Sequence, residues 1–177
     1  MIELVYETHA ITVDNERGIA TGWLPGELSA AGRGTAAELG ARRREDGLAA
    51  VFCSDLRRAV ETVEIAFGGA LPVHLDERLR ECDYGELTGM PVERLDAERA
   101  RHVEEPWPGG ESYGDVVART RSFLADLARD RDGERLLVVA HSANRWALQH
   151  LLEGEPLEEL VSRGFDWQPG WEFVLDG

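Results

Sequence analysis

Two histidines each follow directly on a short apolar run of the chain. His9 comes after residues 2–8, and His141 comes after residues 136–140. In open α/β sheets ligands bind beyond the carboxyl ends of the strands, so both imidazoles are expected at the same edge of a sheet. An imidazole nitrogen is a nucleophile, and nearby cations stabilise the charge of a phosphoryl group in transit. With an arginine beside them, these histidines predict transfer of a phosphoryl group from an ester onto a ring nitrogen.

An arginine and a carboxylic acid complete this candidate set. Arg58 lies in the first turns of a predicted helix, from which its side chain can point back over the strand ends. Glu81 lies between a short apolar strand and a glycine-containing loop, and a carboxylic acid in that place could protonate an alkoxide leaving group. Each residue alone also has an ordinary structural interpretation, as a packed histidine, an exposed helix arginine or a solubilising acid. The occurrence of the two histidines, the arginine and the acid together favours a catalytic site.

The elements that must position these residues alternate between strands and helices. Strands are predicted at residues 2–7, 49–53, 71–74, 135–140 and 171–175, and helices at 29–46, 54–67, 92–101, 112–130 and 143–152. Ser29 is the expected N-cap of the first helix, and Ser54 or Asp55 that of the second. Residues 8–27 are expected to form a long loop. The alternation predicts a three-layer α/β sandwich, with a mostly parallel central sheet and helices on both faces, as a single domain over residues 1–177.

Composition narrows the classes of function. Hydrophobic residues make up 43% of the 177 residues and charged residues 30%, which is typical of a globular domain. The net charge of -15 argues against nucleic acid and anionic membranes as partners. Cys53 and Cys82 are too few for a disulfide framework and lack metal-ligand spacing. Without an apolar stretch of membrane-spanning length or a signal-peptide pattern, the expected location is cytoplasmic.

Taken together, the motifs resemble those of the histidine phosphatase superfamily, with its phosphoglycerate mutase-like fold. The resemblance covers nearly the whole chain. The matching pieces, in order, are His9 with Asn15 and Gly22, Leu28-Ser29-x-x-Gly32, Ser54-Asp55-Leu56-x-Arg58-Ala59-x-x-Thr62, Leu79-x-Glu81 with Tyr84-Gly85 and Gly89, Pro108-Gly109-Gly110-Glu111-Ser112, and Val138-Val139-Ala140-His141. Six pieces in the right order and at the expected spacing make the signal specific.

The resemblance implies roles for four residues. His9 would be the nucleophile that becomes phosphohistidine, Arg58 and His141 would bind the phosphoryl oxygens, and Glu81 would protonate the leaving oxygen. It implies no metal and no cofactor. The expected activity is hydrolysis of small phosphomonoesters. A phosphatase is favoured over a mutase because the chain is short and stops soon after its last predicted strand.

The sequence departs from the family signature immediately before His9. That signature is Arg-His-Gly or Arg-His-Ala with an asparagine six residues after the histidine, so Asn15 places Thr8 where the arginine is expected. A register with Tyr6 and Glu7 in the Arg-His places is rejected, because it misaligns Asn15. Arg17 or Arg145 could supply the missing guanidinium, although each could equally be a surface residue. The alternative is a weak or inactive member that binds a ligand or protein in the same cleft.

Two of the five tryptophans lie in loops that should approach the strand ends. Trp23 and Trp107 could therefore wall a pocket for an apolar part of the substrate, although most tryptophans in a chain of this length belong to the core. The expected partner is a small phosphorylated molecule. Nucleic acid and membrane are not expected as partners. The sequence is compatible with a homodimer.

Overall fold

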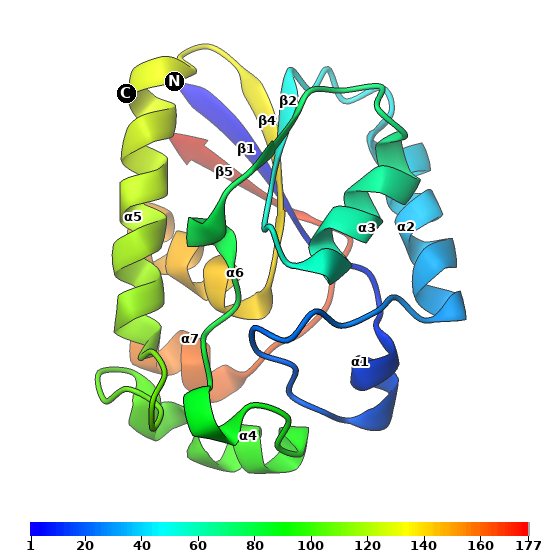
Figure 1. The fold of residues 1–177 in the computed structure, drawn as a ribbon. Coiled ribbons are helices and arrows are strands. Elements are labelled where there is room, and N and C mark those ends of the chain that lie inside the picture. Colours follow the sequence, from blue (N-terminus) through cyan, green and yellow to red (C-terminus); the bar gives the residue numbers. More distant parts are fainter. Residues whose placement is uncertain (177) are drawn as a thin grey trace.

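A five-stranded sheet lies at the centre of the computed structural model, which describes residues 1–176 (Figure 1). Its strands are β1 (Ile2–Thr8), β2 (Ala50–Cys53), β3 (Val73–Leu75), β4 (Arg135–Ala140) and β5 (Trp171–Leu175). The spatial order is β3-β2-β4-β1-β5. β1, β2, β3 and β4 run parallel, and only β5 is antiparallel to its neighbour β1. The predicted mostly parallel α/β sheet is confirmed.

Both faces of the sheet are covered by helices, because alternate strand residues are apolar on both sides. Val5 and Leu137 pack into one cluster with α2 (Ala30–Arg43) and α3 (Arg57–Phe67). Leu4 and Leu136, one position earlier in each strand, pack into another with Phe123 of α5 (Tyr113–Asp130). Figure 1 shows α2 and α3 together on one side of the sheet and α5 on the other. A side-chain period of 2 along buried strands produces this three-layer arrangement.

Of the two predicted N-caps, that of α2 is confirmed and that of α3 is not. The hydroxyl of Ser29 accepts from the backbone N–H of Gly32, so Ser29 caps α2 as predicted. Neither Ser54 nor Asp55 caps α3, whose N-cap is Leu56. The prediction was wrong because both polar side chains have tertiary partners: Ser54 contacts His141, and Asp55 pairs with Arg80.

The sequence pattern did not predict several short helices and turns. The expected long loop contains α1 (Val13–Arg17), which Thr12 and Asn15 stabilise through a reciprocal capping box. The predicted helix at 92–101 is α4 (Val92–Glu98) followed by a 3-10 turn. The last predicted helix is α6 (Ser142–Leu148), which continues as a single π-helical turn. An unpredicted helix, α7 (Leu157–Arg163), precedes β5.

A buried carboxylate fixes the carboxyl end of β1. Glu7 is 1% exposed and accepts hydrogen bonds from Arg42 at 3.1 Å and from Arg43 at 2.8 Å, both on α2. A buried charge is tolerated only when it is paired in this way. The two pairs hold the last residues of β1 against α2, directly before Thr8 and His9.

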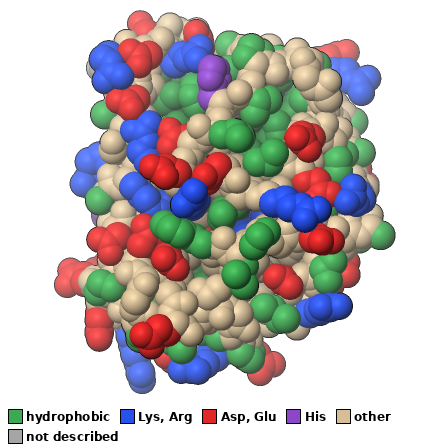
Figure 2. Space-filling view, in the orientation of Figure 1, with side chains coloured by type: hydrophobic (Ala, Val, Ile, Leu, Met, Phe, Trp, Pro, Cys, Tyr) green, Lys and Arg blue, Asp and Glu red, His purple; other side chains and the backbone are tan. Residues whose placement is uncertain are grey.

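Charges of both signs are spread over the surface. On the face seen in Figure 2, arginine side chains are interspersed among acidic ones, so the net negative charge does not form a single patch there. None of the helices within residues 1–176 combines the length and apolar character needed to span a membrane.

Candidate active site

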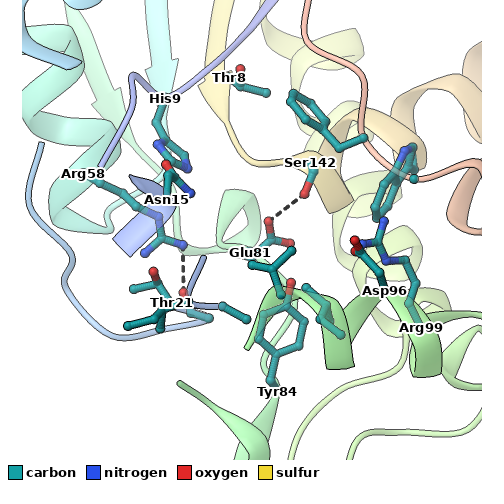
Figure 3. Close-up of a pocket in the computed structure, with 18 of the residues that line it drawn as sticks. Thr8, His9, Asn15, Thr21, Arg58, Glu81, Tyr84, Asp96, Arg99 and Ser142 are labelled. Atoms are coloured by element: carbon teal, nitrogen blue, oxygen red, sulfur yellow. Dashed lines mark hydrogen bonds and ion pairs between the residues drawn. The ribbon is translucent and has the colours of Figure 1, made fainter. Parts of the chain in front are cut away.

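A cavity of about 520 Å³ opens at the carboxyl ends of β1 and β4 (Figure 3). Segments far apart in the sequence supply its polar residues. They are Thr8, His9, Asn15, Thr21, Arg58, Glu81, Asp96, Arg99, Ser142 and Arg163. The edge predicted for the two histidines is therefore where the cavity lies, as expected for an open parallel sheet.

His9 is the first residue after β1, and its imidazole is held in one neutral form. Its Nδ1 lies 2.8 Å from the carbonyl oxygen of Ala10, which can only accept, so Nδ1 carries the proton and Nε2 keeps its lone pair. Its backbone N–H donates to the carbonyl of Ala140 on β4. Burial, together with the positive charge of Arg58, lowers the pKa of His9 to about 3.

His141, the first residue after β4, lies behind the wall of this cavity rather than lining it. Its ring is fully buried, with its centroid 5.1 Å from that of His9. Its Nε2 lies 2.8 Å from the hydroxyl of Ser54, and the Tyr6 hydroxyl donates to its carbonyl oxygen. Burial and nearby Arg58 lower the pKa of His141 well below the usual value. The structure brings both histidines together, with His9 at the cavity surface.

These pKa shifts predict that both rings stay neutral in mildly acidic solution. A histidine with an ordinary pKa of about 6.5 is almost fully protonated at about pH 5, whereas His9, with a pKa of about 3, is not. Imidazole NMR signals of the folded protein followed against pH should show this, with free histidine as the reference. Since the unfolded chain binds this proton and the folded chain does not, His9 makes stability fall as pH drops from about 6.5 towards 3. An ordinary titration of the His9 signal would contradict the structure.

Arg58 reaches the cavity from the first turn of α3. It is 2% exposed, and its guanidinium donates to the carbonyl oxygens of Gly22 at 2.8 Å and Leu24 at 3.0 Å. These bonds use only part of the guanidinium's five donors. In Figure 3 its head group lies on the same side of the cavity as His9, as the sequence predicted. Arg58 therefore places a positive charge at the cavity and also holds the loop between α1 and α2 in place.

Glu81 faces His9 across the cavity (Figure 3) and is fixed by two donors. One carboxylate oxygen accepts from the backbone N–H of Cys82 at 2.7 Å, and the other from the hydroxyl of Ser142 at 3.1 Å. Its backbone carbonyl accepts from the indole N–H of Trp23 at 2.7 Å and from Arg119 at 3.0 Å. The carboxyl group is thus held towards the cavity from both sides. Sequence reasoning missed Ser142, although its place directly after His141 was a usable signal.

The other predicted binding residues divide into two groups. Thr8 and Asn15 line the cavity as expected. Arg17 is exposed at the end of α1, and Arg145 faces a second cavity, so neither completes the site in place of the missing guanidinium. Trp107 is 1% exposed and stacks on the ring of His102, which corrects its expected place in the pocket wall.

The prediction for Trp23 was also wrong. Its ring does not line the cavity but lies against Arg80, and its N–H supports Glu81 from behind. Residues outside the predicted set also line the cavity. They are Val92, Leu95, Asp96, Arg99, Trp146, Arg163 and Phe165. Arg99 pairs with Asp96 and lies 5.2 Å from the ring centre of Trp146. Four of these seven side chains are apolar, and Asp96 and Arg99 lie across the cavity from His9 (Figure 3).

Comparison with known proteins places this geometry in a family. The family model of the histidine phosphatase superfamily (branch 1) matches residues 8–167. A 2,3-bisphosphoglycerate-dependent phosphoglycerate mutase of Methylobacterium sp. (strain 4-46) is 34% identical, over 89% of this chain and 83% of the relative. Phosphoserine phosphatase 1 of Hydrogenobacter thermophilus is 31% identical, over 94% of this chain and 83% of the relative.

A solved structure agrees with these relatives. That of Bacillus stearothermophilus YhfR superposes with a TM-score of 0.87 at 28% identity, over 100% of this chain and 93% of the other. The match thus extends from the sequence motifs to the whole arrangement of sheet and helices. The chain belongs to the histidine phosphatase superfamily.

Proposed function

We propose that this protein is a phosphatase that hydrolyses phosphomonoesters through a phosphohistidine intermediate on His9. The observation that carries the proposal is the shared cavity of His9, Arg58 and Glu81, in which the unprotonated Nε2 of His9 is the available nucleophile. The family contains both phosphatases and mutases among the relatives of this chain, so the superfamily alone does not decide between them.

The reaction takes two steps. The Nε2 lone pair of His9 attacks phosphorus, the P–O ester bond breaks, and the leaving oxygen takes a proton from the Glu81 carboxyl group. The Glu81 carboxylate then takes a proton from water, whose oxygen attacks phosphorus, and the P–N bond breaks to return the electron pair to His9. Arg58 stabilises the negative charge on the phosphoryl oxygens in both steps. We assign His141 a positioning role behind His9, where its ring packs against the His9 imidazole with the ring centres 5.1 Å apart.

We place the leaving group against the apolar side chains that line the cavity. Phe165, Trp146 and Leu95 would contact the carbon skeleton of the ester. Only the phosphoryl group needs the polar end with His9. This division favours esters whose alcohol carries an apolar portion, a role that the sequence had given to Trp23 and Trp107.

Trapping the intermediate tests the proposal directly. Brief exposure to a labelled phosphodonor, followed by denaturation in alkali, should leave protein-bound phosphate that acid releases, as expected of a phosphoramidate. The label should be absent from His9→Gln and present in His74→Gln. A wild-type protein that binds phosphate but never acquires label, and that leaves varied esters intact, would instead favour a ligand-binding member of the family.

Thr8 provides a second test, because we propose that it occupies the place of the signature arginine. It lies at the end of β1 and lines the cavity, so an arginine there would project towards the phosphoryl group. One added charge-assisted hydrogen bond contributes about 1.5–3 kcal/mol, so Thr8→Arg should tighten inorganic phosphate binding roughly tenfold or more. Competitive inhibition by phosphate measures this. Thr8→Gln, of similar reach but uncharged, is the control, and equal effects of both variants would place Thr8 away from the phosphoryl group.

A further inference from the structure

A second cavity, of about 410 Å³, lies on the other side of the segment that links α7 to β5. Its lining residues come from α6 and the π-helical turn after it, from α7, and from the segment that leads into the first residue of β5. They are Arg145, Gln149, Leu160, Arg163, Gly164, Asp166, Gln168 and Trp171. Arg163 and Gly164 line both cavities, so only this segment separates the second cavity from the candidate active site. Nothing in the proposed hydrolysis uses it.

The lining of this cavity includes a buried arginine, Arg145, whose Nε is buried without a hydrogen-bond partner. Arg145 is 8% exposed, and its guanidinium lies 5.2 Å from the ring centre of Phe165 and 4.9 Å from that of Trp171. Among residues 1–176 no side chain or carbonyl accepts a hydrogen bond from this guanidinium, and no carboxylate lies within ion-pair distance. Burial lowers the pKa of Arg145, while the negative charges of Asp166 and Glu155 act in the opposite direction without pairing with it.

The other two buried arginines show how unusual this is. Arg58 donates to two backbone carbonyls, and Arg99 is paired with Asp96. Arg145 has aromatic rings beside it but no acceptor, and stacking on a ring replaces only part of the lost hydration of a guanidinium. A planar oxyanion entering the cavity would supply the missing acceptor.

The charges around Arg145 set the kind of anion that fits. Arg163 is already paired with Glu155 at 2.9 Å, so it adds little free positive charge. Asp166 lines the same cavity without pairing with Arg145, and it would repel a multiply charged anion. One negative charge is therefore what the site accommodates, in a planar group that can use two guanidinium donors.

We propose that this second cavity binds a small organic carboxylate through the guanidinium of Arg145. The carboxylate would pair with the terminal nitrogens, and the rest of the molecule would lie against Trp171 and the polar rim. Such a ligand is a monoanion distinct from the phosphorylated substrate, and the site is distinct from that of His9.

The test is a titration with acetate, benzoate or inorganic phosphate at constant ionic strength, followed by the indole N–H NMR signal of Trp171. Trp171→Phe assigns that signal. Acetate or benzoate should shift it in a saturable way, with a Kd in the millimolar range. Arg145→Gln should weaken this binding at least tenfold, because it removes the positively charged guanidinium that would bind the carboxylate through two nitrogens. Asp166→Asn should tighten it several-fold, because it removes the competing negative charge.

A matched control separates this site from the active site. Arg58→Gln removes the buried cation of the first cavity and should leave carboxylate binding at Trp171 unchanged. Loss of binding in Arg58→Gln, saturation by phosphate in preference to the carboxylates, or no saturable shift would each overturn the proposal. If Arg145→Gln does not fold, the Asp166→Asn variant tests the proposal instead. Carboxylate binding that is unchanged or weaker in Asp166→Asn contradicts the assignment. None of these measurements requires turnover, so failure here is distinguishable from failure of the proposed phosphatase.

Discussion

His9→Ala should abolish hydrolysis of phosphomonoesters while leaving the fold intact. Loss of a covalent nucleophile costs on the order of 10⁶-fold in turnover in a well-studied hydrolase, because no other group can form the intermediate. Here the nearest other imidazole, that of His141, is fully buried and bonded to Ser54, so it cannot replace His9 at the cavity surface. The measurement is kcat/KM for nitrophenyl phosphate, with circular dichroism to confirm folding.

His74→Ala is the matched control for this prediction. His74 is an exposed histidine on β3, outside the cavity, and its loss should change kcat/KM by less than about twofold. Substantial hydrolysis by purified His9→Ala would remove His9 from the role of nucleophile. An equal loss in both variants would indicate a general effect on stability rather than on chemistry.

Glu81→Gln should slow alkyl phosphates far more than nitrophenyl phosphate. Nitrophenolate leaves without protonation, whereas an alkoxide needs a proton, which the proposal assigns to Glu81, and general acid catalysis contributes about 10²–10⁴-fold. Glutamine preserves the local hydrogen bonds, because its carbonyl can accept from Cys82 and its amide can donate to the Ser142 hydroxyl. The variant therefore removes the proton and keeps the geometry.

The comparison should use kcat/KM for both kinds of ester, because this ratio reports the phosphorylation step and not the later hydrolysis of phosphohistidine. Glu86→Gln, an exposed carboxylate five residues along that does not line the cavity, is the control. If Glu81→Gln reduces kcat/KM equally for alkyl and nitrophenyl esters, Glu81 has a structural role and another group must protonate the leaving oxygen.

The sequence alone identified the sheet and the residues that meet at its edge. Each strand that is buried on both faces is a nearly continuous apolar run, so β1 and β4 could be located, and the residue after each run had to lie at the carboxyl edge. His9, His141, Arg58 and Glu81 were found in this way and from the resemblance to the family. Local rules also sufficed for the cap at Ser29, since that hydrogen bond spans three residues.

Only the tertiary structure decided where side chains between or beyond these elements point. Arg145 is four residues after His141, yet the helix carries its side chain away from the candidate active site and beside the rings of Phe165 and Trp171. Trp107 was expected in a pocket wall, but it packs against His102 and Tyr84 in the core. Arg99 and Phe165 joined the active-site cavity without a sequence signal. Such placements depend on how whole elements pack against one another, and spacing along the chain does not record that packing.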